Sequence, residues 1–193
     1  MIQLGTWQPM PRPRLCLALL TLVALAGCGG DARPAAERAA EPRPTPAAYP
    51  VAYAVDRGEL DELAERSLPE ALEGRKVVAT STWEPYTLVV LSEWLHEKGI
   101  ELDPPPALAA RANAIGEAWD APVFVIAAEH ARRYGKRLAR LRPPEAELQR
   151  FFESFTEEPR GTAGQEMAEW LDVVRRSVSE ARGDRVVVIP VEE

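Results

Sequence analysis

Cysteine is nearly absent from this chain of 193 residues, which contains only Cys16 and Cys28. Residues 29–193 therefore contain no thiol, and a domain built from them must be held together by its apolar core rather than by disulfides. Thiol catalysis and cysteine-ligated metal sites are excluded for that part of the chain.

Motifs for nucleotide or metal chemistry are also missing. The sequence has no P-loop, no G-x-G-x-x-G fingerprint and no H-E-x-x-H, and its two histidines, His96 and His130, are far apart. We therefore expect no cofactor and no bound metal, and a capping or surface role for each histidine. No residue is singled out as catalytic.

Positive charge is in deficit. The formal net charge is −7, and removing residues 1–27 would make it −9, because that stretch holds Arg12 and Arg14 and no acidic residue. Nucleic-acid-binding domains are usually basic, so we expect no nucleic-acid partner.

No apolar run is long enough to cross a bilayer comfortably. The longest, Leu15–Ala26, covers roughly 18 Å as a helix, against a hydrocarbon core of about 30 Å. Arg12 and Arg14 precede it, and small residues follow it. This combination is typical of a secretory signal peptide rather than of a transmembrane helix.

The end of this run, Leu25-Ala26-Gly27-Cys28, resembles the lipobox of bacterial lipoproteins. The resemblance implies that Cys28 becomes the first residue of the mature chain and carries acyl chains that hold the protein at a lipid bilayer. Because Gly29 rather than an aspartate follows the cysteine, it also implies an outer-membrane location facing the periplasm.

The chain thus divides into three parts. Residues 1–27 are a predicted signal peptide, and residues 28–50 are a predicted disordered tether, because they are rich in proline and alanine without apolar periodicity. Residues 51–193 are long enough for one globular domain.

Within that domain, strands are expected near residues 51–55, 76–80, 123–127 and 185–189. The continuously apolar segment 123–127 is predicted to be the central strand. Asp56 with Glu59, and Thr162 with Gln165, suggest capping boxes. The predicted class is α/β or α+β, with a mixed or parallel sheet of three to four strands covered by five to six helices. The helices are expected to begin at Asp56, to span 86–98, 107–118, 128–141 and 144–156, and to run from Thr162 to Gly183.

The most unusual local feature is a concentration of positive charge within residues 132–142 of this otherwise acidic chain. Its members are Arg132, Arg133, Lys136, Arg137, Arg140 and Arg142. Arg132, Lys136 and Arg140 are four residues apart, so on a helix they form one stripe, and their mutual repulsion calls for compensating negative charge. That charge would come from the domain itself (Glu145, Glu147 or the acidic first helix), from an acidic partner, or from lipid phosphate.

These features favour a membrane-anchored periplasmic lipoprotein whose non-catalytic domain binds another envelope protein, as an inhibitor or immunity protein or as an accessory subunit in envelope assembly. One alternative is a small envelope hydrolase that uses carboxylates or Ser81, for which His96 and Asp103 would be the most economical partners. Another is a groove lined by Trp83, Tyr86 and Trp119 that binds a glycan or small ligand.

The lipobox interpretation makes a direct prediction. Mass spectrometry of the protein isolated from membranes should find a chain that begins at Cys28 and carries acyl chains. An unmodified Cys28 still joined to residues 1–27, in a cytosolic fraction, would contradict it.

Overall fold

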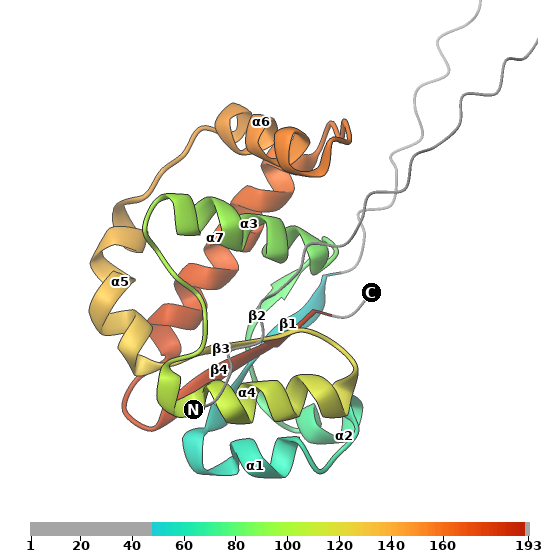
Figure 1. Ribbon diagram of the computed structural model, residues 1–193, viewed down its shortest axis with the longest axis vertical. Coiled ribbons are helices and arrows are strands. Elements are labelled where there is room, and N and C mark those ends of the chain that lie inside the picture. The colour runs from blue at the N-terminus through green and yellow to red at the C-terminus, as the bar shows by residue number, and fades with distance from the viewer. Residues whose placement is uncertain (1–47, 192–193) are drawn as a thin grey trace, which may run out of the picture. The chain divides into compact units, whose positions relative to one another are not determined.

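The computed structural model describes residues 48–191, and the predicted signal peptide, Cys28 and most of the tether lie outside this range. One four-stranded sheet with helices on both faces accounts for the fold (Figure 1). The predicted class, a small sheet of up to four strands covered by helices, is confirmed. The strands are β1 (Tyr49–Asp56), β2 (Lys76–Ser81), β3 (Val123–Ile126) and β4 (Arg185–Pro190).

The sheet order is β2-β1-β4-β3, and each of its three neighbouring pairs is antiparallel. The parallel pairing admitted by the sequence was wrong. Connections long enough for a parallel crossover are equally able to bring the chain back in the opposite direction, so connection length alone does not fix strand direction. β1 begins at Tyr49, so residues 49 and 50, assigned above to the tether, belong to the sheet.

Among residues 48–191, β3 is an edge strand paired only with β4, and the prediction that it is central was also wrong. Its apolar run has a different cause. Phe124 and Ile126 pack into the core on one face of the sheet, whereas Val123 and Val125 pack into the core on the other. Burial on both faces removes the polar alternation whether the strand is central or at an edge.

One face of the sheet is covered by the short helices α1 (Leu60–Leu63) and α2 (Leu68–Leu72) and by α4 (Pro106–Trp119). The helical unit expected from Asp56 onward, with an interruption at Pro69, forms as a 3-10 turn, α1 and α2, and Pro69 lies in the first turn of α2. Asp56 ends β1 and makes no capping bond, so the first predicted capping box is absent. Its partner Glu59 forms an ion pair with Arg75 instead.

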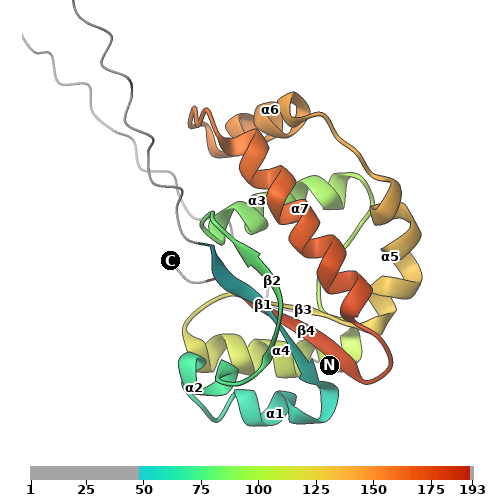
Figure 2. The same ribbon diagram turned by 180° about the vertical axis from the view of Figure 1, so that it is seen from behind.

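The other face is covered by α7 (Ala163–Glu180), which packs against the sheet. Around α7 lie α3 (Tyr86–Glu97), α5 (Ala128–Arg140) and α6 (Glu145–Thr156) (Figure 2). These four helices begin and end within two or three residues of the predicted positions. The second predicted capping box is absent, because the Thr162 hydroxyl donates to Glu166 rather than capping a backbone N–H.

Gly164 allows α7 to start close against α6. A Cβ at this position would lie 2.5 Å from the backbone oxygen of Glu145, so no other residue fits without moving the helices apart. None of the helices within residues 48–191 has both the length and the apolar character needed to span a bilayer.

Glu180, at the end of α7, ties together three elements. Its carboxylate accepts from Lys76 of β2 at 2.6 Å and from Arg185 of β4 at 2.7 Å, and these hydrogen bonds lower the pKa of Glu180. Since the pKa in the folded state is depressed, this contribution to stability is present above the usual pKa of 4.5 and is lost as the pH falls through the folded value.

We therefore expect Glu180→Gln to lower the free energy of unfolding at pH 7 by about 0.5 to 1 kcal/mol, since the pairs are partly exposed. The difference from wild type should shrink in urea titrations at pH 3 and in 1 M salt. A difference of equal size at pH 3 and pH 7 would contradict this assignment.

Candidate functional site

Five of the six cationic residues lie on one side of α5, and Arg142 follows two residues after the helix ends. Tyr134 and Leu138 are buried against α7, while Ala131 and Leu141 are partly buried beside them. All six basic side chains are exposed. We call these six residues, Arg132, Arg133, Lys136, Arg137, Arg140 and Arg142, the cationic surface.

The internal compensation considered for this surface is only partial. Arg132 lies 3.7 Å from Glu129, and Arg133 lies 3.4 Å from Glu101. Arg137 and Arg142 donate to backbone carbonyls of Gly99 and Leu141. Within the described residues, the side chains of Lys136 and Arg140 make no ion pair or hydrogen bond, and both line a shallow hollow of about 390 Å³.

The acidic groups expected to neutralise this surface are engaged elsewhere or lie apart from it. Glu147 pairs with Lys98 at 2.9 Å. In the first helical segment, Asp61 pairs with Arg111 at 3.0 Å. Glu145 pairs with none of the six cations. The positive charges of Lys136 and Arg140 are therefore exposed to solvent and not neutralised by these acidic groups.

The cationic surface adjoins a groove of about 440 Å³ between α5 and residues 101–106. His130, at the start of α5, holds the two sides together. It is 4% exposed, its Nδ1 accepts from the N–H of Ala127 at 3.0 Å, and its Nε2 lies 2.9 Å from the carbonyl of Asp103. Because Nδ1 is an acceptor, Nε2 is the donor to Asp103. The capping role expected for His130 is confirmed.

The hydrolase trio is not assembled. Ser81 is fully buried, and its hydroxyl accepts from the N–H of Trp83 at 3.0 Å. His96 is exposed in the last turn of α3, at the end remote from Ser81, about 15 Å along that helix. His96 and Asp103 do line one small hollow, of about 230 Å³, to which Ser81 does not contribute.

The three aromatic residues do not form one groove. Trp119 packs in the core on one face of the sheet, where its indole N–H donates to the carbonyls of Leu63 and Arg66. Trp83 packs on the core of the opposite face, and Tyr86 is 47% exposed. Side chains on opposite faces of a sheet cannot line the same surface.

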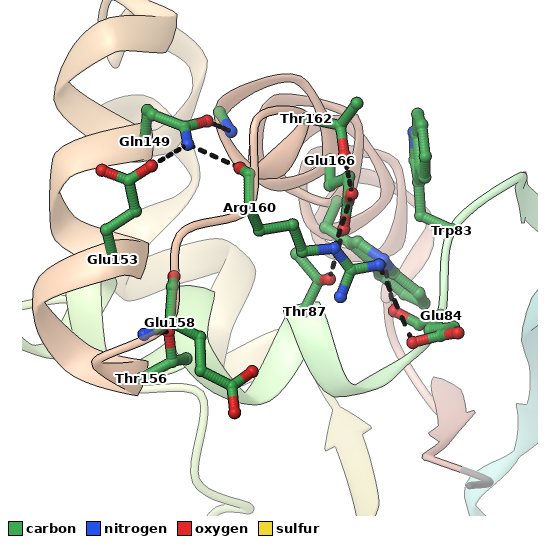
Figure 3. A network of polar contacts seen from close by, with 12 residues as sticks. Trp83, Glu84, Thr87, Gln149, Glu153, Thr156, Glu158, Arg160, Thr162 and Glu166 are labelled. Carbon is green, nitrogen blue, oxygen red and sulfur yellow. Dashed lines mark hydrogen bonds and ion pairs between the residues drawn. The ribbon is translucent and has the colours of Figure 1, made fainter. Parts of the chain in front are cut away.

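A buried carboxylate was missed from the sequence. Glu166, in the first turn of α7, is completely buried and accepts hydrogen bonds from Arg160 at 2.9 Å, Thr162 at 2.6 Å and Thr87 at 3.1 Å (Figure 3). The signal was available, because Glu166 lies four residues before the buried Trp170, on the apolar side of the helix. This network joins α3, α7 and the loop between α6 and α7.

In the described part of the chain, no three histidine, cysteine, aspartate or glutamate side chains converge as metal ligands would. No protein-family model, curated protein or solved structure matches the chain, so the site has to be interpreted from its own chemistry.

The Glu166 network predicts a specific pattern of stability. Arg160→Met should reduce the free energy of unfolding by about 3 kcal/mol, because it leaves a buried carboxylate without its cation. The double variant Arg160→Met/Glu166→Met should recover much of that loss, since the unpaired charge is then gone. Both are measured by urea unfolding.

Arg150→Met, on the exposed side of α6, is the matched control and should change stability little. A double variant no more stable than Arg160→Met would show that the buried charge is not the cause of the loss.

Proposed function

We propose that this chain is a lipid-anchored protein of the bacterial envelope whose domain binds an acidic surface of a partner protein through the cationic surface of α5, without catalysis. The observation that carries the proposal is the exposure of Lys136 and Arg140 without an anionic partner in the described residues. In a chain with a net charge of −7, such a helix face is suited to electrostatic recognition.

The placement of α5 supports this proposal. The chain enters the domain at Tyr49, and α5 lies across the molecule from the start of β1 in both views (Figures 1 and 2). The cationic surface is thus remote from the point at which residues 28–48 would join the domain, which is compatible with a partner binding at α5.

Helix energetics also favour a carboxylate-bearing partner. Arg132, Lys136 and Arg140 are at i, i+4 and i+8, so each neighbouring pair is repulsive by a few tenths of a kcal/mol. Carboxylates brought by a partner would replace repulsion with attraction and would speed association at low salt. This chemistry suits an inhibitor or immunity protein and an accessory subunit equally.

The test is capture of partners from detergent-solubilised membranes with tagged full-length chains. Wild type should retain a partner protein that Lys136→Glu/Arg140→Glu binds at least about tenfold more weakly at low ionic strength. Arg150→Glu/Arg176→Glu, which makes the same change in net charge on α6 and α7, should retain it. The unfolding free energies of the two double variants should match.

Binding by wild type should weaken as salt is raised, because exposed charges are screened. Recovery of the same proteins by wild type and by the α5 variant, or recovery of none by wild type, would contradict the proposal.

A further inference from the structure

A second groove, which we call the α2 groove, lies on the other face of the sheet from α5. It has a volume of about 440 Å³ and is lined by Tyr53 of β1 and by residues of α2. Leu68, Pro69 and Leu72 make its walls apolar. Val77, the cross-strand neighbour of Tyr53, is 42% exposed, so the apolar surface continues onto β2. Contiguous exposed apolar surface with a polar rim is a mark of protein interaction sites.

Two exposed carboxylates form the polar rim of the α2 groove. Glu70 and Glu73 both line it, and within residues 48–191 neither side chain makes an ion pair or a hydrogen bond. Glu59, Asp61 and Glu62 of the preceding segment, in contrast, each pair with an arginine. The α2 groove is therefore apolar inside and negatively charged at its rim. This combination suits lysine and arginine side chains, which have an aliphatic stem and a cationic end.

The cationic surface presents such side chains in a matching arrangement. Its two members without a bonding partner in the described residues, Lys136 and Arg140, are four positions apart on α5. Glu70 and Glu73 are three positions apart, and Glu73 is the C-cap of α2. Both spacings place the two side chains on one side of a helix, with about 5 to 6 Å between their Cβ atoms. The two cations can therefore meet the two carboxylates in pairs.

One molecule cannot make this contact with itself. α2 and α5 lie on opposite sides of the domain in both views, and they pack into the cores on opposite faces of the sheet (Figures 1 and 2). Carboxylates that meet α5 must therefore come from another molecule. Every other copy of this chain has them, beside an apolar groove that accepts the stems of the cationic side chains.

We propose that the partner of the cationic surface is a second copy of this chain, whose α2 groove receives Lys136 and Arg140 of the first copy. The aliphatic stems pack against the apolar walls, and the charged ends pair with Glu70 and Glu73. This inference rests on the proposed function, because it names the partner of the surface described there. Complementary charge and matched spacing on the two surfaces favour this partner over an unrelated acidic protein.

The test measures binding between two full-length chains that carry different tags. Each chain is purified separately in detergent and the two are mixed. One tag is then captured, and the amount of the other chain is measured over a range of concentrations. Wild type should bind wild type saturably, and binding should weaken as salt is raised, because exposed charges are screened.

Reversing the charge on either surface should abolish this self-binding. Lys136→Glu/Arg140→Glu and Glu70→Lys/Glu73→Lys should each weaken it by at least about tenfold, because like charges then face each other. A mixture of the two variants should bind about as well as wild type, since the two altered surfaces again have opposite charge. Restored binding in the mixture cannot come from variants that have failed to fold.

The matched control is Glu93→Lys/Glu97→Lys, which makes the same change in net charge at two exposed positions of α3. It should bind wild type unchanged. The unfolding free energies of all three double variants should match that of wild type in urea titrations.

Three results would overturn the inference: wild type that does not bind itself, self-binding that Glu70→Lys/Glu73→Lys leaves unchanged, or a mixture as weak as its components. Loss of a different protein in the Glu70→Lys/Glu73→Lys variant, without self-binding by wild type, would also overturn it, because the α2 groove would then serve another basic partner. The proposed function survives all four results if Lys136→Glu/Arg140→Glu loses a partner that wild type retains from membranes. Unchanged binding by that α5 variant contradicts both proposals.

Discussion

Burial of β4 on both of its faces is the constraint from which the rest of the fold follows. Val187 and Ile189 enter one core, while Val186 and Val188 enter the other, and all four are at most 1% exposed. Because neither apolar face of the sheet can remain exposed to water, a layer of helices has to cover each face. α7 covers one face and gives α3, α5 and α6 a surface to pack on. The orientation of α5 is then fixed by Tyr134 and Leu138, and its charged side is displayed as a consequence.

Much of this arrangement was predictable because periodicity reports burial directly. The helices at 86–98, 107–118, 128–141 and 144–156 were placed well, since apolar residues at helical spacing mark a buried stripe. Strand order was not predictable, because an apolar run such as 123–127 indicates that a strand is buried on both faces and does not indicate which strands pair with it. The capping boxes failed for a related reason. Glu59 pairs with Arg75, 16 residues along the chain, which local spacing does not predict, and Thr162 donates to Glu166, one residue beyond the expected Gln165.

The candidate site, like the fold, was predictable from the sequence only in part. Exposure of the cationic residues and the i,i+3 pair of Arg132 with Glu129 follow from spacing on α5, whereas the pairing of Arg133 with Glu101 depends on how residues 101–106 lie against the helix. The groove exists only through that contact, which His130 maintains across 27 positions of sequence. Interactions of this range are what a single sequence does not reveal. Ser81 illustrates the opposite error. Its position after a predicted strand suggested a catalytic serine, whereas in the structure its hydroxyl is buried and accepts a hydrogen bond from the N–H of Trp83.

The Glu166 network indicates why a costly charge persists in the core. An apolar residue at this position would pack on Trp170 without any desolvation cost, yet it would not hold the loop that contains Arg160. Thr87 from α3 and Thr162 from the start of α7 converge on the same carboxylate, so the network fixes three elements at one point. Two residues earlier in the same turn, Gly164 allows α6 and α7 to approach closely, so the start of α7 is held against both α3 and α6. α5 packs against the same helix through Tyr134 and Leu138, so α7 is the element that contacts both the buried network and the helix that bears the cationic surface.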